Sequence, residues 1–131
     1  MTVYGKGGQI RGYLNIKDTL QCVRLSLGQP ARAGELRIFN QFVETFSVNQ
    51  LADKVQEAGK QLGLDVKINN VPNPRIEAED HYYNPVHTGL LELGLKPHYL
   101  TEEVLTEMLE VALRYKGNIK EHAIFRGVKW K

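Results

Sequence analysis

Apolar residues return every three or four positions over much of the chain, which is the spacing of an amphipathic helix. Four segments carry this pattern and are predicted to be helices: residues 18–28, 47–63, 86–94 and 101–117. The second segment is the clearest, because its apolar residues line one side along its whole length: Val48, Leu51, Val55, Ala58 and Leu62.

Polar residues and glycines mark the ends of these predicted helices. Ser47 and Gln50 have the spacing of a capping box at a helix start, and Asp18 and Gln21 have the same spacing. Thr101 is predicted to cap the last helix. Glycines at positions 28, 63 and 94 are predicted to end the first three helices.

Short segments that favour strands lie between the helices. They are residues 11–16, 35–40 and 64–71, with a further short strand predicted at 81–83. Strands that alternate with helices predict an α/β fold. Three or four short strands in this order are too few for a complete doubly wound domain, so we expect the chain to be part of a larger α/β fold.

Composition excludes several functional classes. The 131 residues suit one domain, and the net charge of +2 is too mild for a nucleic-acid surface. No apolar run is long enough to span a membrane, so no membrane partner is expected. Cys22 is the single cysteine, which favours a reducing, cytoplasmic compartment. The four histidines lack tight ligand spacing, so no metal site is predicted.

The glycine-rich stretch "YGKGGQIRGYLNIKD", residues 4–18, raises the question of which anion it could hold. A Walker loop needs a serine or threonine after its Gly-Lys pair, but Gly7 follows Lys6. A dinucleotide fingerprint needs a glycine where Ile10 stands, and it opens a helix rather than a strand. From spacing alone, a glycine-rich turn with Arg11 on the surface is the simpler interpretation.

Three segments taken together change that interpretation. They are "VYGKGGQIRGYLNIKDTLQCV", "LRIFNQFVETFSVNQLADKV" and "NPRIEAEDHYYNPVHTGLLELGLKP". In this order they resemble segments of the extended short-chain dehydrogenase/reductase family, the NAD-dependent nucleotide-sugar epimerases and dehydratases. The resemblance runs from Thr2 to Trp130. It implies that the chain is the C-terminal, substrate-binding part of such an enzyme, with the last elements of its Rossmann half.

The resemblance also implies a set of substrate-binding residues. The pyrophosphate of a nucleotide sugar suits arginines, whose forked N–H donors pair with phosphate oxygens. The residues that match the family's two phosphate-binding arginines are Arg11 and Arg75. Tyr4 matches the position beside the ribose and uracil, and Gln9 is expected to support the nucleotide. Glu79 stands only approximately where the family has an aspartate.

The family pattern implies a division of the chain at residue 46. Residues 1–46 would hold the nucleotide-sugar loop and the final Rossmann elements, and residues 47–131 the substrate-binding domain. NAD and the catalytic Tyr-x-x-x-Lys pair would belong to an N-terminal Rossmann half outside this chain. Tyr13 and Lys17 have that spacing, but they lie on a strand that leads to a helix cap. This chain alone is therefore expected to be inactive, and the intact enzyme to be a homo-oligomer.

At two places this chain differs from most members of the family, and these differences point to one group within it. Gly12 follows Arg11 where most members have aspartate, and residues 75–79 replace the usual Arg-Pro-Gly-Asp. A smaller group in the family shares both departures, and its substrates are UDP-glucose and sulfite. Two alternatives stay open: another nucleotide-sugar dehydratase or epimerase, and a stand-alone binding module without a catalytic partner.

A Rossmann sheet would normally cover part of residues 18–40. We therefore expect five apolar side chains to lack cover in this chain: Leu20, Val23, Leu27, Leu36 and Ile38. The predicted strand 35–40 would also present an unpaired edge. Both features predict that the isolated chain self-associates through this face, or that the segment rearranges.

Overall fold

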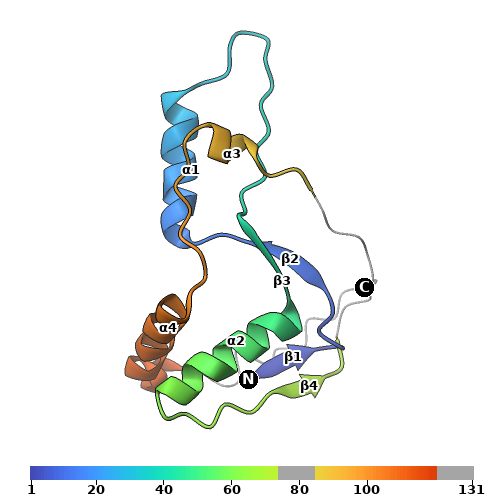
Figure 1. The fold of residues 1–131 in the computed structure, drawn as a ribbon, viewed down its shortest axis with the longest axis vertical. Coiled ribbons are helices and arrows are strands. Elements are labelled where there is room, and N and C mark those ends of the chain that lie inside the picture. Colours follow the sequence, from blue (N-terminus) through green and yellow to red (C-terminus); the bar gives the residue numbers. More distant parts are fainter. Residues whose placement is uncertain (74–84, 121–131) are drawn as a thin grey trace. The chain divides into compact units, whose positions relative to one another are not determined.

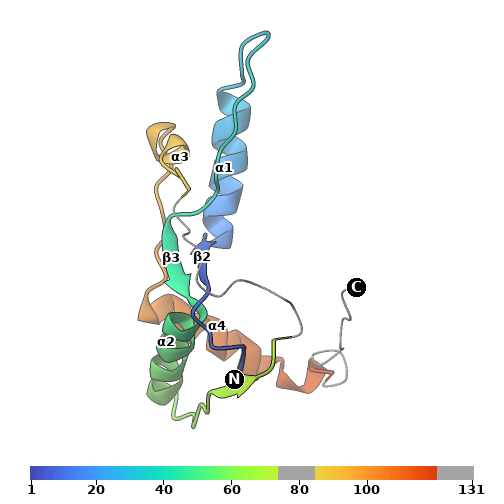
Figure 2. The same cartoon turned by 90° about the vertical axis from the view of Figure 1, so that its right-hand side faces the viewer.

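The computed structural model describes residues 1–73 and 85–120. Its elements, in chain order, are β1 (Thr2–Tyr4), β2 (Ile10–Tyr13), α1 (Ile16–Gly28), β3 (Glu44–Ser47), α2 (Val48–Gln61), β4 (Asn69–Val71), α3 (Gly89–Glu92), α4 (Glu102–Arg114) and the 3-10 turn η1 (Lys116–Asn118). Figure 1 and Figure 2 show these elements from two sides. Helices mixed with strands, including one parallel strand pair, confirm the predicted α/β class.

The chain divides into two compact units. The described residues of the first, the α2/α4 unit, are 1–9, 47–73 and 101–120, and those of the second, the α1/α3 unit, are 10–46 and 85–100. Both units draw on segments that are far apart in sequence. The predicted assignment of 1–46 and 47–131 to two functional domains stays a prediction.

The α2/α4 unit is built on a parallel strand pair and two packed helices. β1 pairs with β4 in a register that sets Val3 opposite Asn70, and the Val3 side chain is fully buried. α2 packs against α4, with Ala52 and Ala58 buried on α2 and Leu105 buried on α4. Burial of these apolar side chains supplies the unit with its core.

Local capping signals in this unit were predicted correctly. The Ser47 hydroxyl accepts from the Gln50 N–H at 3.1 Å, and the Gln50 side chain accepts from the Ser47 N–H at 2.7 Å, which confirms the capping box. The Thr101 hydroxyl accepts from the Val104 N–H at 3.3 Å, which confirms the cap of α4. α2 ends at Gln61, and Gly63 follows with a φ of 71°.

In the α1/α3 unit, the core lies between α1 and α3. Its buried members are Cys22, Leu90 and Leu95. Partly buried residues pack around them: Leu14, Leu25, Phe39, Val43 and Leu93. β2 pairs with β3, and the Tyr13 and Phe46 rings lie 5.9 Å apart between their centroids.

The predicted start of α1 was wrong by two residues. The helix begins at Ile16, and its cap is Asn15, whose side chain accepts from the Lys17 N–H at 3.0 Å. Asp18 and Gln21 therefore form no capping box, and Asp18 lies in the first turn. Asparagine caps a helix as well as aspartate does, and a carboxylate in the first turn suits the positive end of the helix.

The predicted strand at 35–40 was also wrong. This segment contains no strand, and Leu36 and Ile38 are 84% and 78% exposed. A strand needs a partner for its backbone N–H and C=O groups, and alternating apolar residues mark a face without supplying that partner. The unpaired edge expected there is absent as well. The predicted strand at 81–83 lies outside the described residues.

Within residues 1–73 and 85–120, no helix has the length and apolar character needed to cross a membrane.

Candidate functional site

The glycine-rich loop at residues 5–9 follows β1 and is held down by two asparagines of the α2/α4 unit. The Asn49 side chain donates to the Lys6 carbonyl at 2.8 Å, and the Asn49 backbone N–H donates to the Gly7 carbonyl at 3.0 Å. The Asn70 side chain donates to the Gly5 carbonyl at 3.0 Å. These contacts hold three successive loop carbonyls, so the loop has a defined shape before any ligand arrives.

Glycine is required at two positions of this loop. Gly5 and Gly7 have φ angles of 67° and 73°, in the left-handed region that side chains disfavour. A Cβ on Gly7 would also collide with the Asn49 side chain. Gly8 differs, because a Cβ there would have no other atom within 4 Å. The glycines therefore serve a tight turn that packs against the start of α2.

The backbone N–H groups at the start of α2 are not available to bind an anion. Its first N–H groups donate within the protein: Val48 to the Gln9 carbonyl at 3.3 Å, Asn49 to Gly7, and Gln50 to the Ser47 hydroxyl. A phosphate-binding helix start needs these donors for its ligand. The start of α2 therefore does not fit the pyrophosphate of a dinucleotide.

The side-chain oxygen of Gln9 is buried without a hydrogen-bond donor in the described part of the chain. The Gln9 side chain is 4% exposed, and its Oε1 atom accepts no hydrogen bond from any described residue. A buried acceptor without a donor costs about 1–3 kcal/mol. A ligand N–H or O–H that reached this oxygen would remove that cost. The predicted role of Gln9 beside the nucleotide stays a prediction.

Arg11 lies on β2, in the α1/α3 unit, and its Nη1 donates to the Ile10 carbonyl at 2.9 Å. Tyr13 is two residues further along the same strand. Burial raises the pKa of the Tyr13 hydroxyl, and the positive charge of Arg11 lowers it to a smaller extent. The positive charge of Arg11 therefore acts on the Tyr13 hydroxyl, two residues along the same strand.

The five predicted site residues are divided between the two units and the residues that the structure does not describe. Tyr4, 42% exposed at the end of β1, and Gln9 belong to the α2/α4 unit, and Arg11 belongs to the α1/α3 unit. Arg75 and Glu79 lie outside the described residues. The predicted convergence of Arg11 and Arg75 on one pyrophosphate stays a prediction.

Packing explains the glycine at position 12. A Cβ there would lie 2.6 Å from Cγ of Phe42, far inside van der Waals contact. Phe42 is 6% exposed, and its ring stacks on His87 with centroids 4.4 Å apart. The resemblance to the extended short-chain dehydrogenase/reductase family makes Gly12 a departure from the expected aspartate, and the structure leaves no space for that side chain because Phe42 occupies it.

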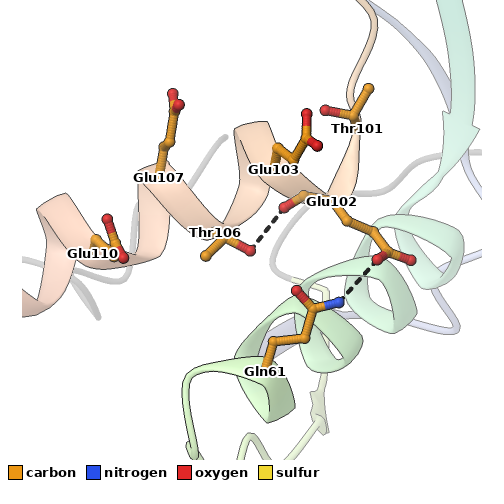
Figure 3. Close-up of a pocket in the computed structure, with 7 residues that line it drawn as sticks. All are labelled: Gln61, Thr101, Glu102, Glu103, Thr106, Glu107 and Glu110. Atoms are coloured by element: carbon orange, nitrogen blue, oxygen red, sulfur yellow. Dashed lines mark hydrogen bonds between the residues drawn. The ribbon is translucent and has the colours of Figure 1, made fainter.

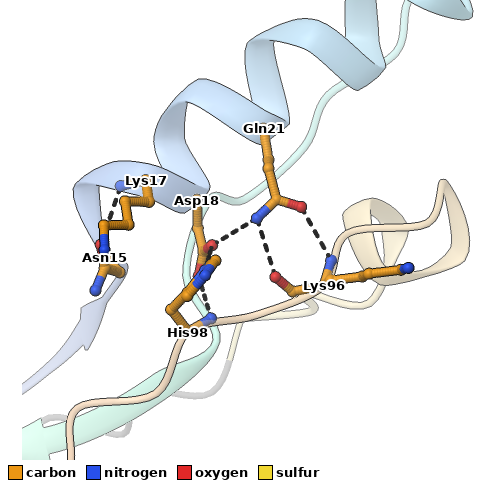
Figure 4. Close-up of polar contacts among 6 residues, drawn as sticks. All are labelled: Asn15, Lys17, Asp18, Gln21, Lys96 and His98. Carbon is orange, nitrogen blue, oxygen red and sulfur yellow. Dashed lines mark hydrogen bonds and ion pairs between the residues drawn. The ribbon is translucent and has the colours of Figure 1, made fainter.

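A polar network in the α1/α3 unit was missed by sequence reasoning (Figure 4). Asp18 is fully buried, and its carboxylate accepts from the His98 backbone N–H at 2.6 Å, from His98 Nδ1 at 2.6 Å and from Gln21 Nε2 at 2.8 Å. Gln21 also binds both backbone groups of Lys96, at 3.0 and 3.3 Å. The only signal in the sequence was Asp18 four residues before Cys22, on the inner side of α1.

An open pocket in the α2/α4 unit has the wrong charge for a phosphate (Figure 3). Its lining residues are Gln61, Thr101, Glu102, Glu103, Thr106, Glu107 and Glu110. Glu102 accepts from Gln61 Nε2 at 2.9 Å, and the remaining carboxylates would repel an anion. In the described part of the chain, no three His, Cys, Asp or Glu side chains gather as metal ligands.

Comparison with known proteins gives the chain close relatives. No family model matches it. Over its full length it is 55% identical to "UDP-sulfoquinovose synthase, chloroplastic" from Spinacia oleracea, and over 133 aligned residues 43% identical to "UDP-sulfoquinovose synthase" from Sulfolobus acidocaldarius. It spans only 27% and 34% of these two proteins, and it matches their C-terminal part.

Proposed function

We propose that this chain is the C-terminal, nucleotide-sugar-binding part of a UDP-sulfoquinovose synthase, which converts UDP-glucose and sulfite to UDP-sulfoquinovose for sulfolipid synthesis. The observation that carries the proposal is the identity of 55% and 43% along the whole chain to two proteins of that name. The proposal includes membership of the extended short-chain dehydrogenase/reductase family, a homo-oligomeric intact enzyme and a cytoplasmic location.

The proposed role of this part is to hold the nucleotide sugar. The loop at 5–9 is preorganised by Asn49 and Asn70, and the buried Oε1 of Gln9 is an acceptor that a ligand donor would satisfy. Arg11 and Arg75 would pair with the pyrophosphate, whose two negative charges suit guanidinium groups. Tyr4 would pack beside the ribose and uracil, and Glu79 would line the sugar.

Holding the phosphates restricts the position of the sugar, and this is how the chain would contribute to rate. A substrate fixed in orientation no longer has to find its reactive geometry by diffusion, which is catalysis by proximity. The start of α2 has no free N–H donors for a pyrophosphate, which supports the proposal that NAD is bound by the part of the enzyme that the relatives have and this chain does not span. That part would supply the oxidation and reduction chemistry.

The test of the proposed site is the substrate affinity of arginine variants of the intact enzyme. Arg11→Ala and Arg75→Ala are each expected to raise the Kd for UDP-glucose about tenfold or more, because each removes a charge-assisted contact worth about 1.5 kcal/mol or above. The affinity for NAD should stay the same. Calorimetric titration measures both constants.

Arg32→Ala provides the matched control, since Arg32 is an exposed arginine outside the proposed site. If Arg11→Ala binds UDP-glucose as well as Arg32→Ala does, Arg11 is a surface residue and the site is wrong. Turnover with sulfite is measured separately on the intact enzyme. Conversion of UDP-glucose that does not depend on sulfite would indicate a different nucleotide-sugar dehydratase or epimerase.

The 131-residue chain by itself is expected neither to bind NAD at micromolar concentration nor to convert UDP-glucose. The first N–H donors of α2 are already used within the protein, and no glycine fingerprint opens a helix in the chain. Titration of the chain with NAD checks this result. Binding at micromolar concentration would contradict the proposed division of labour.

A further inference from the structure

Helix α4 carries a second apolar row beside the face that packs on α2. The buried Leu105 marks the packed face. The second row, which we call the α4 row, consists of Val104, Met108, Val111 and Tyr115. These residues are spaced by four, three and four positions, so they lie in one line along the helix, as the a and d positions of a heptad do.

Most of the α4 row is open to solvent. Met108, Val111 and Tyr115 are 60%, 53% and 55% exposed, and Val104 is half-buried. All residues from 110 to 120 are exposed, so the described parts of the chain do not cover the C-terminal half of α4. Single exposed apolar residues are ordinary, whereas a row of them along one helix marks an interaction surface.

Charges along one edge of the α4 row are self-complementary. When the row occupies the a and d positions, Glu107 and Arg114 occupy successive g positions. Both are exposed, neither has an ion-pair partner among the described residues, and Figure 3 shows the Glu107 side chain pointing away from α2. Two antiparallel α4 helices bring their g positions together, so Glu107 of each copy meets Arg114 of the other.

The other edge of the row favours the same orientation. Its e positions hold Leu105 and Ala112, so an antiparallel pair brings no like charges together there. A parallel pair would instead set Glu107 and Arg114 of one copy against these apolar side chains, which leaves each charge without a partner. The antiparallel pair is twofold symmetric and therefore closes after two copies.

Helix α1 has an apolar row of the same spacing but not the same complementarity. Its members Ile16, Leu20, Val23 and Leu27 are 72%, 68%, 49% and 77% exposed, which confirms the expectation that the last three lack cover. An antiparallel pair of α1 helices would set Lys17 of one copy against Arg24 of the other, and these like charges repel. The α4 row is therefore the better surface for self-association.

We propose that two copies of this chain associate through antiparallel packing of their α4 rows, with Glu107 and Arg114 forming reciprocal ion pairs across the contact. This inference rests on the part of the proposed function that makes the enzyme a homo-oligomer, and it assigns a surface to that assembly. Two helices of 13 residues bury less area than a standard interface, so the dimer is weak, with a Kd on the order of 100 µM.

Sedimentation equilibrium of the 131-residue chain, from about tenfold below to about tenfold above that concentration, measures the Kd of the dimer. Val111→Asp should raise this Kd at least about tenfold, because it places a charge in the apolar contact. Glu107→Arg and Arg114→Glu should each raise it about five- to tenfold, because each change replaces two attractive pairs with two repulsive ones. The double variant should restore the original Kd, since its pairs are only reversed.

Leu20→Asp is the matched control, because it makes the same kind of change on the exposed row of α1 and should leave the Kd of the dimer unchanged. Circular dichroism checks that every variant keeps its helix content. Three results would overturn the proposal: a monomer at all these concentrations, equal weakening by Val111→Asp and Leu20→Asp, or no recovery of the dimer in the double charge variant.

The proposed nucleotide-sugar site has a separate readout. In the intact enzyme, Val111→Asp should leave the Kd for UDP-glucose unchanged, because the α4 row contains none of the proposed site residues. If the intact enzyme binds no UDP-glucose, the proposed site falls and the α4 pairing stands. If UDP-glucose binds but the chain does not pair through α4, the site stands and this inference falls.

Discussion

Replacement of Asp18 with asparagine is expected to destabilise the chain by about 3 kcal/mol, which is a change of more than a hundredfold in the unfolding equilibrium. All three contacts of this buried carboxylate come from donors: the His98 backbone N–H, His98 Nδ1 and Gln21 Nε2. An asparagine would turn an NH2 group towards at least one of them. The variant would therefore lose acceptors and bury a donor against a donor.

Urea unfolding of the 131-residue chain, followed by circular dichroism, measures this effect. Asp65→Asn is the control, because the Asp65 side chain is 83% exposed and only pairs with Lys67 at 3.5 Å on the surface. That change should alter the free energy of unfolding by less than about 0.5 kcal/mol. If both variants unfold at the same urea concentration, the Asp18 network does not stabilise the α1/α3 unit.

Gly12→Ala is expected to cost about 2 kcal/mol of stability, in the range seen when a packed core is overfilled. The new methyl group would lie 2.6 Å from Cγ and 2.9 Å from Cβ of Phe42. Phe42 is buried and stacks on His87, so it cannot move away without breaking that contact. Gly8→Ala is the control, since a Cβ at Gly8 meets no other atom within 4 Å and should change stability by less than about 0.5 kcal/mol.

A double-mutant cycle with Phe42→Ala tests whether the clash is the cause. Alanine lacks the Cγ and Cδ1 atoms that the methyl group would meet, so Gly12→Ala should cost at least about 1 kcal/mol less in the Phe42→Ala background. The same urea measurements supply all four free energies. An equal cost of Gly12→Ala in both backgrounds would show that Phe42 is not what excludes a side chain at position 12.

Helix positions were predictable because their signals are local. The capping box of α2 joins residues three positions apart, and Gly63 adopts its left-handed conformation two residues after the helix ends. The strands were not predictable in the same way. β1 pairs with β4, so the partner of Thr2 is Asn69. No local sequence pattern at either residue predicts this pairing. The segment 35–40 had the pattern of a strand but no described partner.

The candidate site was likewise predictable only in part. The arginines, the tyrosine and the glutamine could be named from their motif, and the glycines of the loop from their conformational freedom. The burial of Gln9 and its acceptor without a donor depend on how the loop packs on α2, and no local pattern encodes that packing. Gly12 could be recognised as unusual from the sequence. The reason for the glycine is steric, because the Phe42 side chain, 30 positions later, fills the space that a Cβ would need.

The sequence by itself predicted the helices and the caps of α2 and α4, because these depend on contacts within a few residues. It also named residue types that suit a phosphorylated sugar, which depends on side-chain chemistry alone. Only the tertiary structure decided that Asp18 is a buried acceptor rather than a helix cap, since its partner His98 lies 80 positions away. It also decided which face of α1 is left exposed. Both α1 faces are apolar in sequence, and only the packing of Cys22 and Leu25 shows which face is already in use.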